Sequence, residues 1–151
     1  MTDPLDQIMD VMEASFDPQY REAWTRTQVS DSLIFPSSFF ILVDHQGNLC
    51  DGSDEAAGFV LARRTLDEVE LLLIAVRPEY RGVGIGSKLM EMFLSKAAAA
   101  DARKVFLEVR TDNDARTLYR KLGFEQIGTR PAYYRTVDGR GIDAATYAKT
   151  L

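Results

Sequence analysis

The sequence predicts an α/β fold of the mixed α+β kind, with about six or seven strands in one sheet and about four flanking helices. A continuous apolar run, Leu71–Val76, is followed by a Pro- and Gly-rich turn and then by helical periodicity, which is typical of a buried strand that leads into a helix. Hairpin-like strands precede this unit, and strand–helix–strand segments follow it. This order favours a mixed sheet covered by helices.

The first half of the chain is expected to contain two helices and three strands. In chain order these are helices over residues 3–15 and 25–33 and strands over 38–43, 57–64 and 71–76. Asp3-Pro4 and Thr25 are suitable helix starts, because Asp and Thr side chains cap exposed backbone N–H groups and Pro fits the first helical position. The polar segment 44–56, with its glycines, predicts a long hairpin connection.

The second half is expected to alternate helices and strands. Apolar residues recur at three- and four-residue intervals after the glycine-rich turn, so a helix ending near Asp101 should pack one face on the sheet. Residues 104–110 alternate as a strand, with Glu108 on the face opposite Leu107. A helix around residues 115–122 ends at Gly123. Strands are expected over 124–128 and 142–149, with a Tyr- and Arg-rich loop over 129–141 between them.

Composition limits the function classes. The 151 residues are 46% hydrophobic and 27% charged, which is typical of one ordinary globular domain, so we expect residues 1–151 to form a single domain. No apolar run reaches membrane-spanning length, and the N-terminus does not resemble a signal peptide. The single cysteine, Cys50, excludes an internal disulfide and a cysteine-based metal cluster. We therefore expect a cytoplasmic protein with no membrane partner.

Charge is distributed unevenly along the chain. The net charge of −5 disfavours nucleic acid as a partner. Residues 1–60 contain 11 acidic and 2 basic side chains, whereas residues 61–151 contain 12 acidic and 16 basic ones. One hypothesis is that the second part holds an anionic cofactor while the first attracts a cationic acceptor. The alternative is two differently charged solvated surfaces.

Three glycines alternate in the segment Arg81-Gly82-Val83-Gly84-Ile85-Gly86, at the start of the central helix. Such glycines let backbone N–H groups approach a ligand, and the helix N-terminus favours an anion, so phosphate or pyrophosphate binding is indicated. A dinucleotide fingerprint would need glycine at Ser87, and a P-loop would need Gly-Lys-Ser/Thr, so neither motif is present. The glycines could instead serve only a tight strand–helix connection.

A family resemblance rests on this segment. Val76-Arg77-Pro78-Glu79-Tyr80 followed by the glycine-rich run resembles the acetyl-CoA pyrophosphate loop of the GNAT superfamily of N-acetyltransferases. Leu118-Tyr119-Arg120-Lys121-Leu122-Gly123-Phe124 is similar to a second signature of that superfamily. The resemblance implies a single N-acetyltransferase domain in which acetyl-CoA lies where two neighbouring parallel strands splay apart.

The chain further resembles the bacterial ribosomal-protein alanine N-acetyltransferases. This likeness rests on Trp24-Thr25, on Leu107-Glu108-Val109-Arg110 and on Tyr133–Arg140 followed by Asp143-Ala144. It implies Glu108 as general base and Tyr119 as general acid, with Tyr133 and Tyr134 walling the acceptor groove. It further implies that the backbone of Ile74, Ala75 and Val76 binds the pantetheine of the coenzyme and that Asn113 also contacts the coenzyme. The implied pyrophosphate contacts are Arg81, Gly82, Val83, Gly84, Ile85, Gly86 and Ser87.

The candidate catalytic residues have a plausible chemistry of their own. A carboxylate within an apolar strand, as at Glu108, can accept a proton from an attacking amine, and partial desolvation would raise its pKa. The structural alternative is a pairing of Glu108 with Arg110 or another cation. Tyr119 could protonate a departing thiolate, or could simply be a core aromatic. Glu108 and Tyr119 lie eleven positions apart, one fewer than is common in the family.

The sequence thus predicts direct acetyl transfer from acetyl-CoA to a protein N-terminus, without a metal. Two alternatives remain: a small-amine acetyltransferase, acting on a polyamine, amino acid or drug, and a non-catalytic acetyl-CoA-binding module. His45, on a polar turn, is expected to be exposed rather than catalytic, and Cys50 is expected to be an inert thiol.

Overall fold

The computed structural model describes residues 3–52 and 54–151. Its helices are α1 (Pro4–Ser15), α2 (Arg26–Ile34), α3 (Ile85–Ala99) and α4 (Arg116–Lys121), with short 3₁₀ turns at Pro18–Tyr20 and Pro78–Tyr80. Its strands are β1 (Ser38–Val43), β2 (Gly58–Thr65), β3 (Glu68–Val76), β4 (Lys104–Arg110), β5 (Glu125–Arg135) and β6 (Gly141–Thr150). Across these residues, no helix combines the length and the apolar character needed to cross a bilayer.

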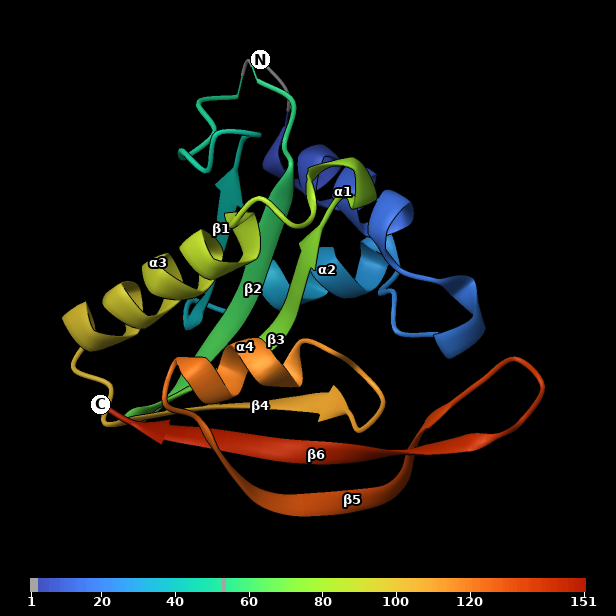
Figure 1. Ribbon diagram of the computed structural model, residues 1–151. Helices are drawn as coiled ribbons and strands as arrows, with labels where there is room; N and C mark the ends of the chain where they lie inside the picture. Colours follow the sequence, from blue (N-terminus) through green and yellow to red (C-terminus); the bar gives the residue numbers. More distant parts are fainter. Residues whose placement is uncertain (1–2, 53) are drawn as a thin grey trace.

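All six strands form one sheet in the order β1-β2-β3-β4-β6-β5. Every neighbouring pair is antiparallel except β3 and β4, which confirms the predicted mixed and mostly antiparallel sheet. The parallel register runs from the Glu68–Lys104 pair to the Leu71–Leu107 pair and stops there. Figure 1 shows β3 and β4 diverging beyond this point. The predicted splayed strand pair is therefore present, and one edge of β3 is left without a strand neighbour.

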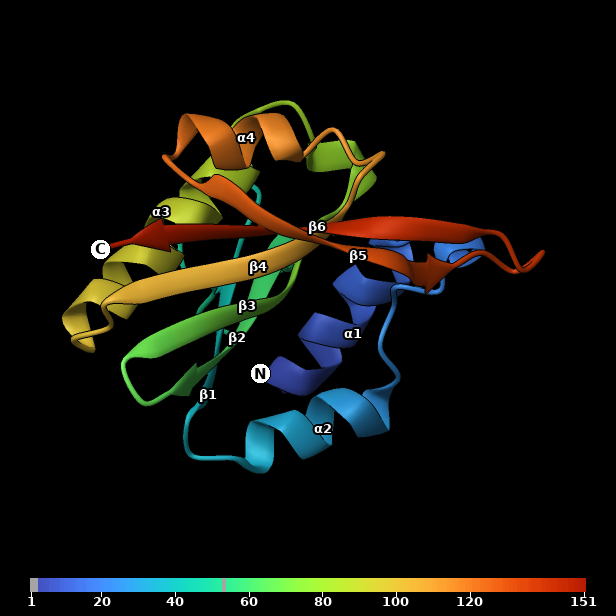
Figure 2. The same cartoon turned by 90° about the horizontal axis from the view of Figure 1, so that it is seen from below.

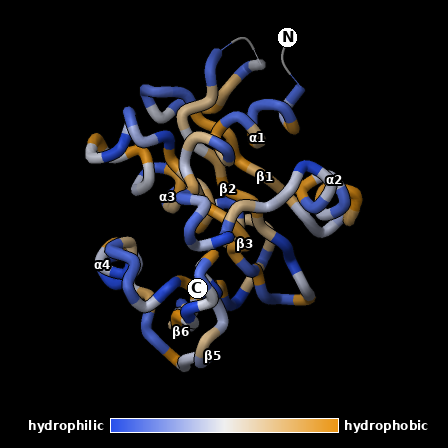
Figure 3. Tube along the Cα trace, turned by 90° about the vertical axis from the view of Figure 1, so that its right-hand side faces the viewer, coloured by the Kyte–Doolittle hydropathy of each residue, from blue (hydrophilic) through white to orange (hydrophobic). Residues whose placement is uncertain are grey.

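Helices cover both faces of the sheet and enclose two apolar clusters. Figure 2 shows α1 and α2 on one side and α3 and α4 on the other. Ile8 of α1 and Val29 of α2 pack with Phe59 of β2 in the first cluster, whereas Leu89 and Phe93 of α3 belong to the second. In Figure 3 the hydrophobic residues concentrate along β1–β3, where these helices pack. Helices thus cover both faces of the sheet up to the point where β3 and β4 diverge.

The predicted helix starts are confirmed at the N-terminal helices. The Asp3 side chain accepts a hydrogen bond from the backbone N–H of Leu5 at 2.8 Å. Thr25 and Gln28 form a reciprocal capping box at the start of α2. Capping of this kind satisfies backbone donors that a helix leaves unpaired, so each short helix begins at a defined residue.

The predicted loop over residues 129–141 is wrong for residues 129–135, because β5 continues through Arg135, whereas residues 136–140 do connect β5 to β6, which begins at Gly141. β5 is an edge strand, and an edge strand tolerates Pro131 because the missing N–H can face away from the ladder. Its register shifts between Arg130 and Tyr134, where Ala132 adopts a φ of 51°. These irregularities interrupt the alternating pattern that would have indicated a strand. The bulged segment carries Arg130, Tyr133 and Tyr134.

Candidate active site

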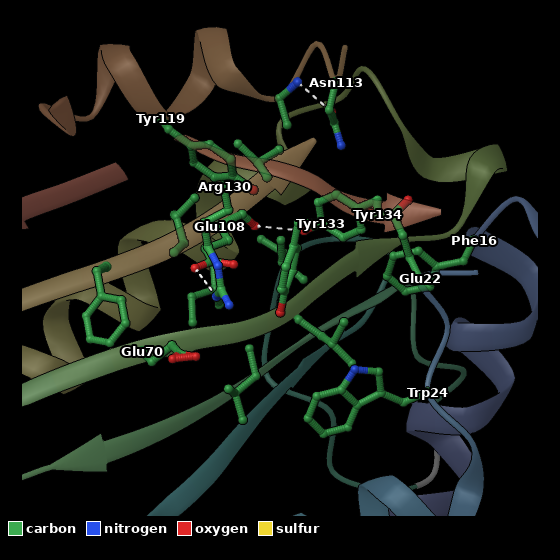
Figure 4. A pocket seen from close by; sticks show the side chains of 18 residues that line it. Phe16, Glu22, Trp24, Glu70, Glu108, Asn113, Tyr119, Arg130, Tyr133 and Tyr134 are labelled. Carbon is green, nitrogen blue, oxygen red and sulfur yellow. Dashed lines mark hydrogen bonds and ion pairs between the residues drawn. The ribbon is translucent and has the colours of Figure 1, made fainter. Parts of the chain in front are cut away.

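A cavity of about 420 Å³ opens where β3 and β4 separate. Its walls come from four parts of the chain: the segment before α2, β3, β4 with the residues that follow it, and β5. The side chains labelled in Figure 4 are Phe16, Glu22, Trp24, Glu70, Glu108, Asn113, Tyr119, Arg130, Tyr133 and Tyr134. Residues far apart in the sequence are therefore gathered where β3 and β4 separate.

Glu108 projects into this cavity from β4. The strand alternates, so that Val105, Leu107 and Val109 are buried in the core and Glu108 faces the other way. Its side chain is 24% exposed, and Oε1 accepts a hydrogen bond from Nη1 of Arg130 at 2.8 Å. Glu108 therefore forms an ion pair, as the structural alternative predicted, but its partner is Arg130 rather than Arg110. The carboxylate remains accessible from the cavity.

Tyr119 reaches the same cavity from α4 (Figure 4). Only 4% of the residue is exposed, and its ring packs edge-on against Phe124 with centroids 6.1 Å apart. Burial, followed by the charge of Glu22, raises the pKa of Tyr119 to about 12. The phenol therefore stays protonated at neutral pH. Tyr119 is both a core aromatic and, like Glu108, a residue of the cavity wall.

A second cavity, of about 500 Å³, adjoins the first. Both cavities are lined by Phe16, Glu22, Ile74, Asn113 and Ala115. Ala75 and Val76 line the second, on the β3 edge that has lost its β4 neighbour. Backbone groups on such an edge can bind an extended ligand, although the carbonyl of Val76 already accepts a hydrogen bond from Nε of Arg81. The separation of β3 from β4 therefore leaves two adjoining cavities along β3.

Asn113 stands at the junction of the two cavities. Its Oδ1 accepts a hydrogen bond from the backbone N–H of Ala115 at 2.8 Å, which fixes the turn before α4. Figure 4 shows the amide nitrogen directed toward the cavity. The side chain is therefore oriented by its own backbone and presents a donor to the open space.

The glycine-rich segment forms the N-terminus of α3. Gly82 and Gly84 have φ of 80° and 90°, a region that residues with a side chain rarely adopt, so the turn itself requires glycine there. A Cβ at either position would meet no atom within 4 Å, and at Gly86 the nearest atom would be Cδ2 of Leu118 at 3.9 Å. Gly84 provides no side-chain cap. The first N–H groups of the helix therefore receive no hydrogen bond from a capping side chain.

Arg81 has a defined structural role beside this turn. Its Nε donates to the carbonyl of Val76 at 3.0 Å, and its Nη2 donates to the carbonyl of Ser15 at 2.8 Å. These bonds tie the end of β3 to the end of α1. Arg81 lines the second cavity, whereas Gly82, Val83, Gly84, Ile85, Gly86 and Ser87 line neither cavity.

Tyr133 and Tyr134 form the β5 wall of the first cavity. Tyr133 is 48% exposed, and the Arg130 guanidinium lies 4.2 Å from its ring centroid. Tyr134 meets Tyr133 edge-on at 5.1 Å, and its hydroxyl donates to the carbonyl of Glu108 at 3.5 Å. Burial is the main cause that raises the pKa of Tyr134. The pair connects the bulged edge strand to β4.

An ion cluster that the sequence did not indicate connects the N-terminal segment to β4. Nε of Arg110 donates to Glu22 at 2.9 Å, Nη1 donates to Asp112 at 2.6 Å, and the guanidinium lies 3.6 Å from the Tyr20 ring centroid. Glu22 is only 15% exposed, and burial raises its pKa although Arg110 acts in the opposite direction. No sequence signal marks this pairing, because its partners are far apart in the chain.

Neither His45 nor Cys50 lies in the cavities. His45 is exposed, as predicted, and its ring lies near Tyr80. Burial and then the charge of Asp44 raise the pKa of the Cys50 thiol to about 11, so little thiolate exists at neutral pH. Residue 53, in the predicted hairpin 44–56, is outside the described residues. Among all the described residues, the cavities included, no group of three His, Cys, Asp or Glu side chains is arranged to hold a metal ion.

Comparisons with known proteins agree on one family. Residues 5–124 match the sequence model of the Acetyltransferase (GNAT) family. The [ribosomal protein bS18]-alanine N-acetyltransferase of Haemophilus influenzae is 33% identical over 120 residues, which is 76% of this chain and 82% of that protein. N-alpha-acetyltransferase RimI of Mycobacterium tuberculosis is 45% identical over 87 residues, 57% of this chain and 51% of that protein.

A solved structure extends the likeness to the whole fold. The crystal structure of the ribosomal-protein-S18-alanine N-acetyltransferase from Escherichia coli superposes with a TM-score of 0.83 at 26% identity. The match covers 97% of this chain and 87% of that one. The splayed sheet and its flanking helices are therefore shared with an acetyltransferase.

Proposed function

The chain belongs to the GNAT family of acetyltransferases, and from that premise we propose that it transfers the acetyl group of acetyl-CoA to the N-terminal amine of a protein. The preferred acceptor would begin with alanine or a similarly small residue, as in a ribosomal protein. The names of the relatives support this acceptor class. The observation that carries the proposal is the junction of two cavities at the splay, with Glu108 and Tyr119 on the wall of one of them.

In the proposed reaction the neutral amine attacks the thioester carbonyl of acetyl-CoA directly. Glu108 takes the amine proton, either itself or through a water molecule, as the C–N bond forms. The C–S bond then breaks, and Tyr119 donates its phenolic proton to the departing thiolate of CoA. The phenol carries its proton at neutral pH, although burial, which raises the pKa of Tyr119 to about 12, also makes it a weaker acid. The products are the N-acetylated protein and CoA.

The proposed reaction has no covalent acetyl-enzyme intermediate. Cys50 is the only cysteine of the chain, lies outside both cavities and carries a thiol whose pKa is raised to about 11. Direct transfer in a ternary complex therefore needs fewer assumptions than a covalent intermediate.

Acetyl-CoA would occupy the second cavity and reach the first with its acetyl group. We propose that the backbone of Ile74, Ala75 and Val76 binds the pantetheine, since this edge of β3 lacks a strand partner. The N–H groups of Gly82–Ser87 would bind the pyrophosphate at the start of α3. Asn113 would contact the coenzyme through its amide nitrogen, and Tyr133 and Tyr134 would flank the acceptor.

The test is CoA release from acetyl-CoA with an alanine-starting peptide, beside the same peptide with a blocked N-terminus and a panel of small amines. We expect turnover only with the free N-terminus. Glu108→Gln and Tyr119→Phe should each lower kcat by about 10²- to 10⁴-fold, the usual contribution of a general acid or base. Binding of CoA by these variants should be unchanged.

Other outcomes would change the assignment. Turnover with small amines alone would make the protein a small-amine acetyltransferase. Full activity of both variants would remove Glu108 and Tyr119 from the reaction. Tight acetyl-CoA binding without turnover on any acceptor would favour a binding module.

A further inference from the structure

Glu70 lines the first cavity, beside Glu108 and Tyr119. The reaction proposed above gives the carboxylate of Glu70 no role. It lies on β3, in register with Phe106 of β4, so its side chain emerges on the same face as that of Glu108, two residues further along. Strand rise and strand spacing put the two Cα atoms about 8 Å apart. Figure 4 shows Glu70 on the cavity wall below the Glu108–Arg130 pair.

The ion pairs around the cavity do not include Glu70. Arg130 forms its ion pair with Glu108, and Arg110 forms its ion pair with Glu22. Within residues 3–52 and 54–151, the side chain of Glu70 makes no hydrogen bond or ion pair. Arg63 stands opposite Glu70 on β2, and Arg63 and Arg130 attract its carboxylate only electrostatically, beyond ion-pair distance. The residue is half-buried, and burial, followed by repulsion from Glu108, raises its pKa.

A half-buried carboxylate without an ion pair is costly for the free protein, because the attraction of Arg63 and Arg130 does not offset its lost hydration and the repulsion from Glu108. A cationic ligand would remove this cost. The cavity already accommodates one guanidinium, since Arg130 lies between the carboxylate of Glu108 and the ring of Tyr133 at 4.2 Å. The same combination of carboxylate and aromatic ring suits a cationic side chain of the acceptor.

We propose that Glu70 is a specificity-determining residue that binds the cationic side chain of the acceptor's second residue. The inference rests on the proposed N-terminal acetylation and names its substrate class: N-termini in which Arg or Lys follows the acetylated residue. With the reacting amine at Glu108, a long side chain on the next residue can span the offset of about 8 Å to Glu70. Glu70 then discriminates between acceptors and takes no part in proton transfer.

The experiment compares three peptides that differ only at the second position: Ala-Arg, Ala-Gln and Ala-Glu. Initial rates at several peptide concentrations give kcat and KM for the wild type, Glu70→Gln and Glu70→Lys. Glu68→Gln is the matched control, because it removes the same charge from an exposed position of the same strand, outside the cavity. Thermal unfolding of each variant verifies that it is folded.

We expect the wild type to favour Ala-Arg over Ala-Gln by about tenfold in kcat/KM, which is about 1.4 kcal/mol. Glu70→Gln should lose this preference through a higher KM for Ala-Arg, with kcat and the values for Ala-Gln within about twofold of the wild type. Glu70→Lys should favour Ala-Glu. Glu68→Gln should retain the wild-type preference.

The outcomes separate this inference from the proposed function. If the wild type acetylates the peptides but Glu70→Gln keeps the preference for Ala-Arg, or if Glu68→Gln loses it equally, the role of Glu70 is wrong and the N-terminal acetyltransferase stands. If free N-termini are not acetylated while small amines are, both proposals fail.

Discussion

At the residue scale, the buried phenol of Tyr119 should link stability to alkaline pH. Burial raises its pKa to about 12, whereas the unfolded chain has a pKa of about 10. A raised pKa in the folded state means that the stabilisation is complete below pH 10 and is lost as pH rises toward 12.

Tyr119→Phe lacks this titration. The free energy of unfolding of the wild type minus that of Tyr119→Phe should therefore be constant up to about pH 9 and should fall by about 1.4 kcal/mol at pH 11. Urea unfolding at a series of pH values measures this difference. A difference that stays constant to pH 11 would mean that the hydroxyl is solvated in the folded protein.

Glu22 should link stability to pH in the same direction as Tyr119, but beginning at acidic pH, above its unfolded pKa. Burial raises its pKa in spite of Arg110, so the folded protein disfavours the ionised carboxylate. The resulting loss of stability is absent below the unfolded pKa and complete above the folded one. Because Arg110 keeps its ion pair with Asp112 at 2.6 Å, Glu22→Gln should have a higher Tm than the wild type at pH 7 and an equal Tm near pH 4. Calorimetry at both values tests this, and a lower Tm at pH 7 would show that the Arg110 pair outweighs burial.

At the element scale, the start of α3 allows the turn and ligand functions of its glycines to be separated. Gly86 has an ordinary φ and room for a Cβ, whereas Gly84 has a φ of 90°. Gly86→Ala should stabilise the free protein by about 0.5 kcal/mol through helix propensity. The same methyl group should weaken CoA binding if the coenzyme approaches this backbone.

Gly84→Ala should instead destabilise the protein by about 1 kcal/mol or more, because alanine disfavours the left-handed region. Gly128→Ala is the control, since its Cβ would lie in open space far along the chain from α3. Urea unfolding and calorimetric titration with CoA provide both quantities. Unchanged CoA affinity in Gly86→Ala would leave the glycines with a turn role only.

Local signals in the sequence were sufficient for most elements. Caps at Asp3 and Thr25 and the alternation of residues 104–110 are short-range patterns, and the structure agrees with them. The first part of β5 was predicted, but its continuation over residues 129–135 was not, because a proline, a bulge and an edge position interrupt the alternation of its residues. The pairing of Glu108 with Arg130, 22 residues away, and that of Glu22 with Arg110, 88 residues away, depend on how the sheet and the N-terminal segment come together. No pattern in one sequence encodes those distances.

At the scale of the whole molecule, ligand binding should stabilise most strongly the region where β3 and β4 separate. β3 and β4 share only the register pairs from Glu68–Lys104 to Leu71–Leu107, so the outer half of β3 lacks a partner on this side. A ligand that bridges residues 74–76 and Asn113 would supply contacts that the free sheet does not make. Binding to the folded state alone adds about 2.7 kcal/mol of stability at a hundredfold excess over Kd.

For a domain of this size that stabilisation corresponds to a rise in Tm of roughly 5–10 °C. We therefore expect CoA to raise Tm by this amount and NAD⁺ at the same concentration to leave it unchanged, since the dinucleotide fingerprint is interrupted at Ser87. Hydrogen exchange should slow for the amides of residues 72–76 and 82–87, while those of the β5–β6 hairpin far from the splay keep their rates. An equal shift with NAD⁺, or protection confined to the hairpin, would place the coenzyme elsewhere. Because the two cavities meet at Ile74 and Asn113, protection there would also put the acetyl group within reach of Glu108.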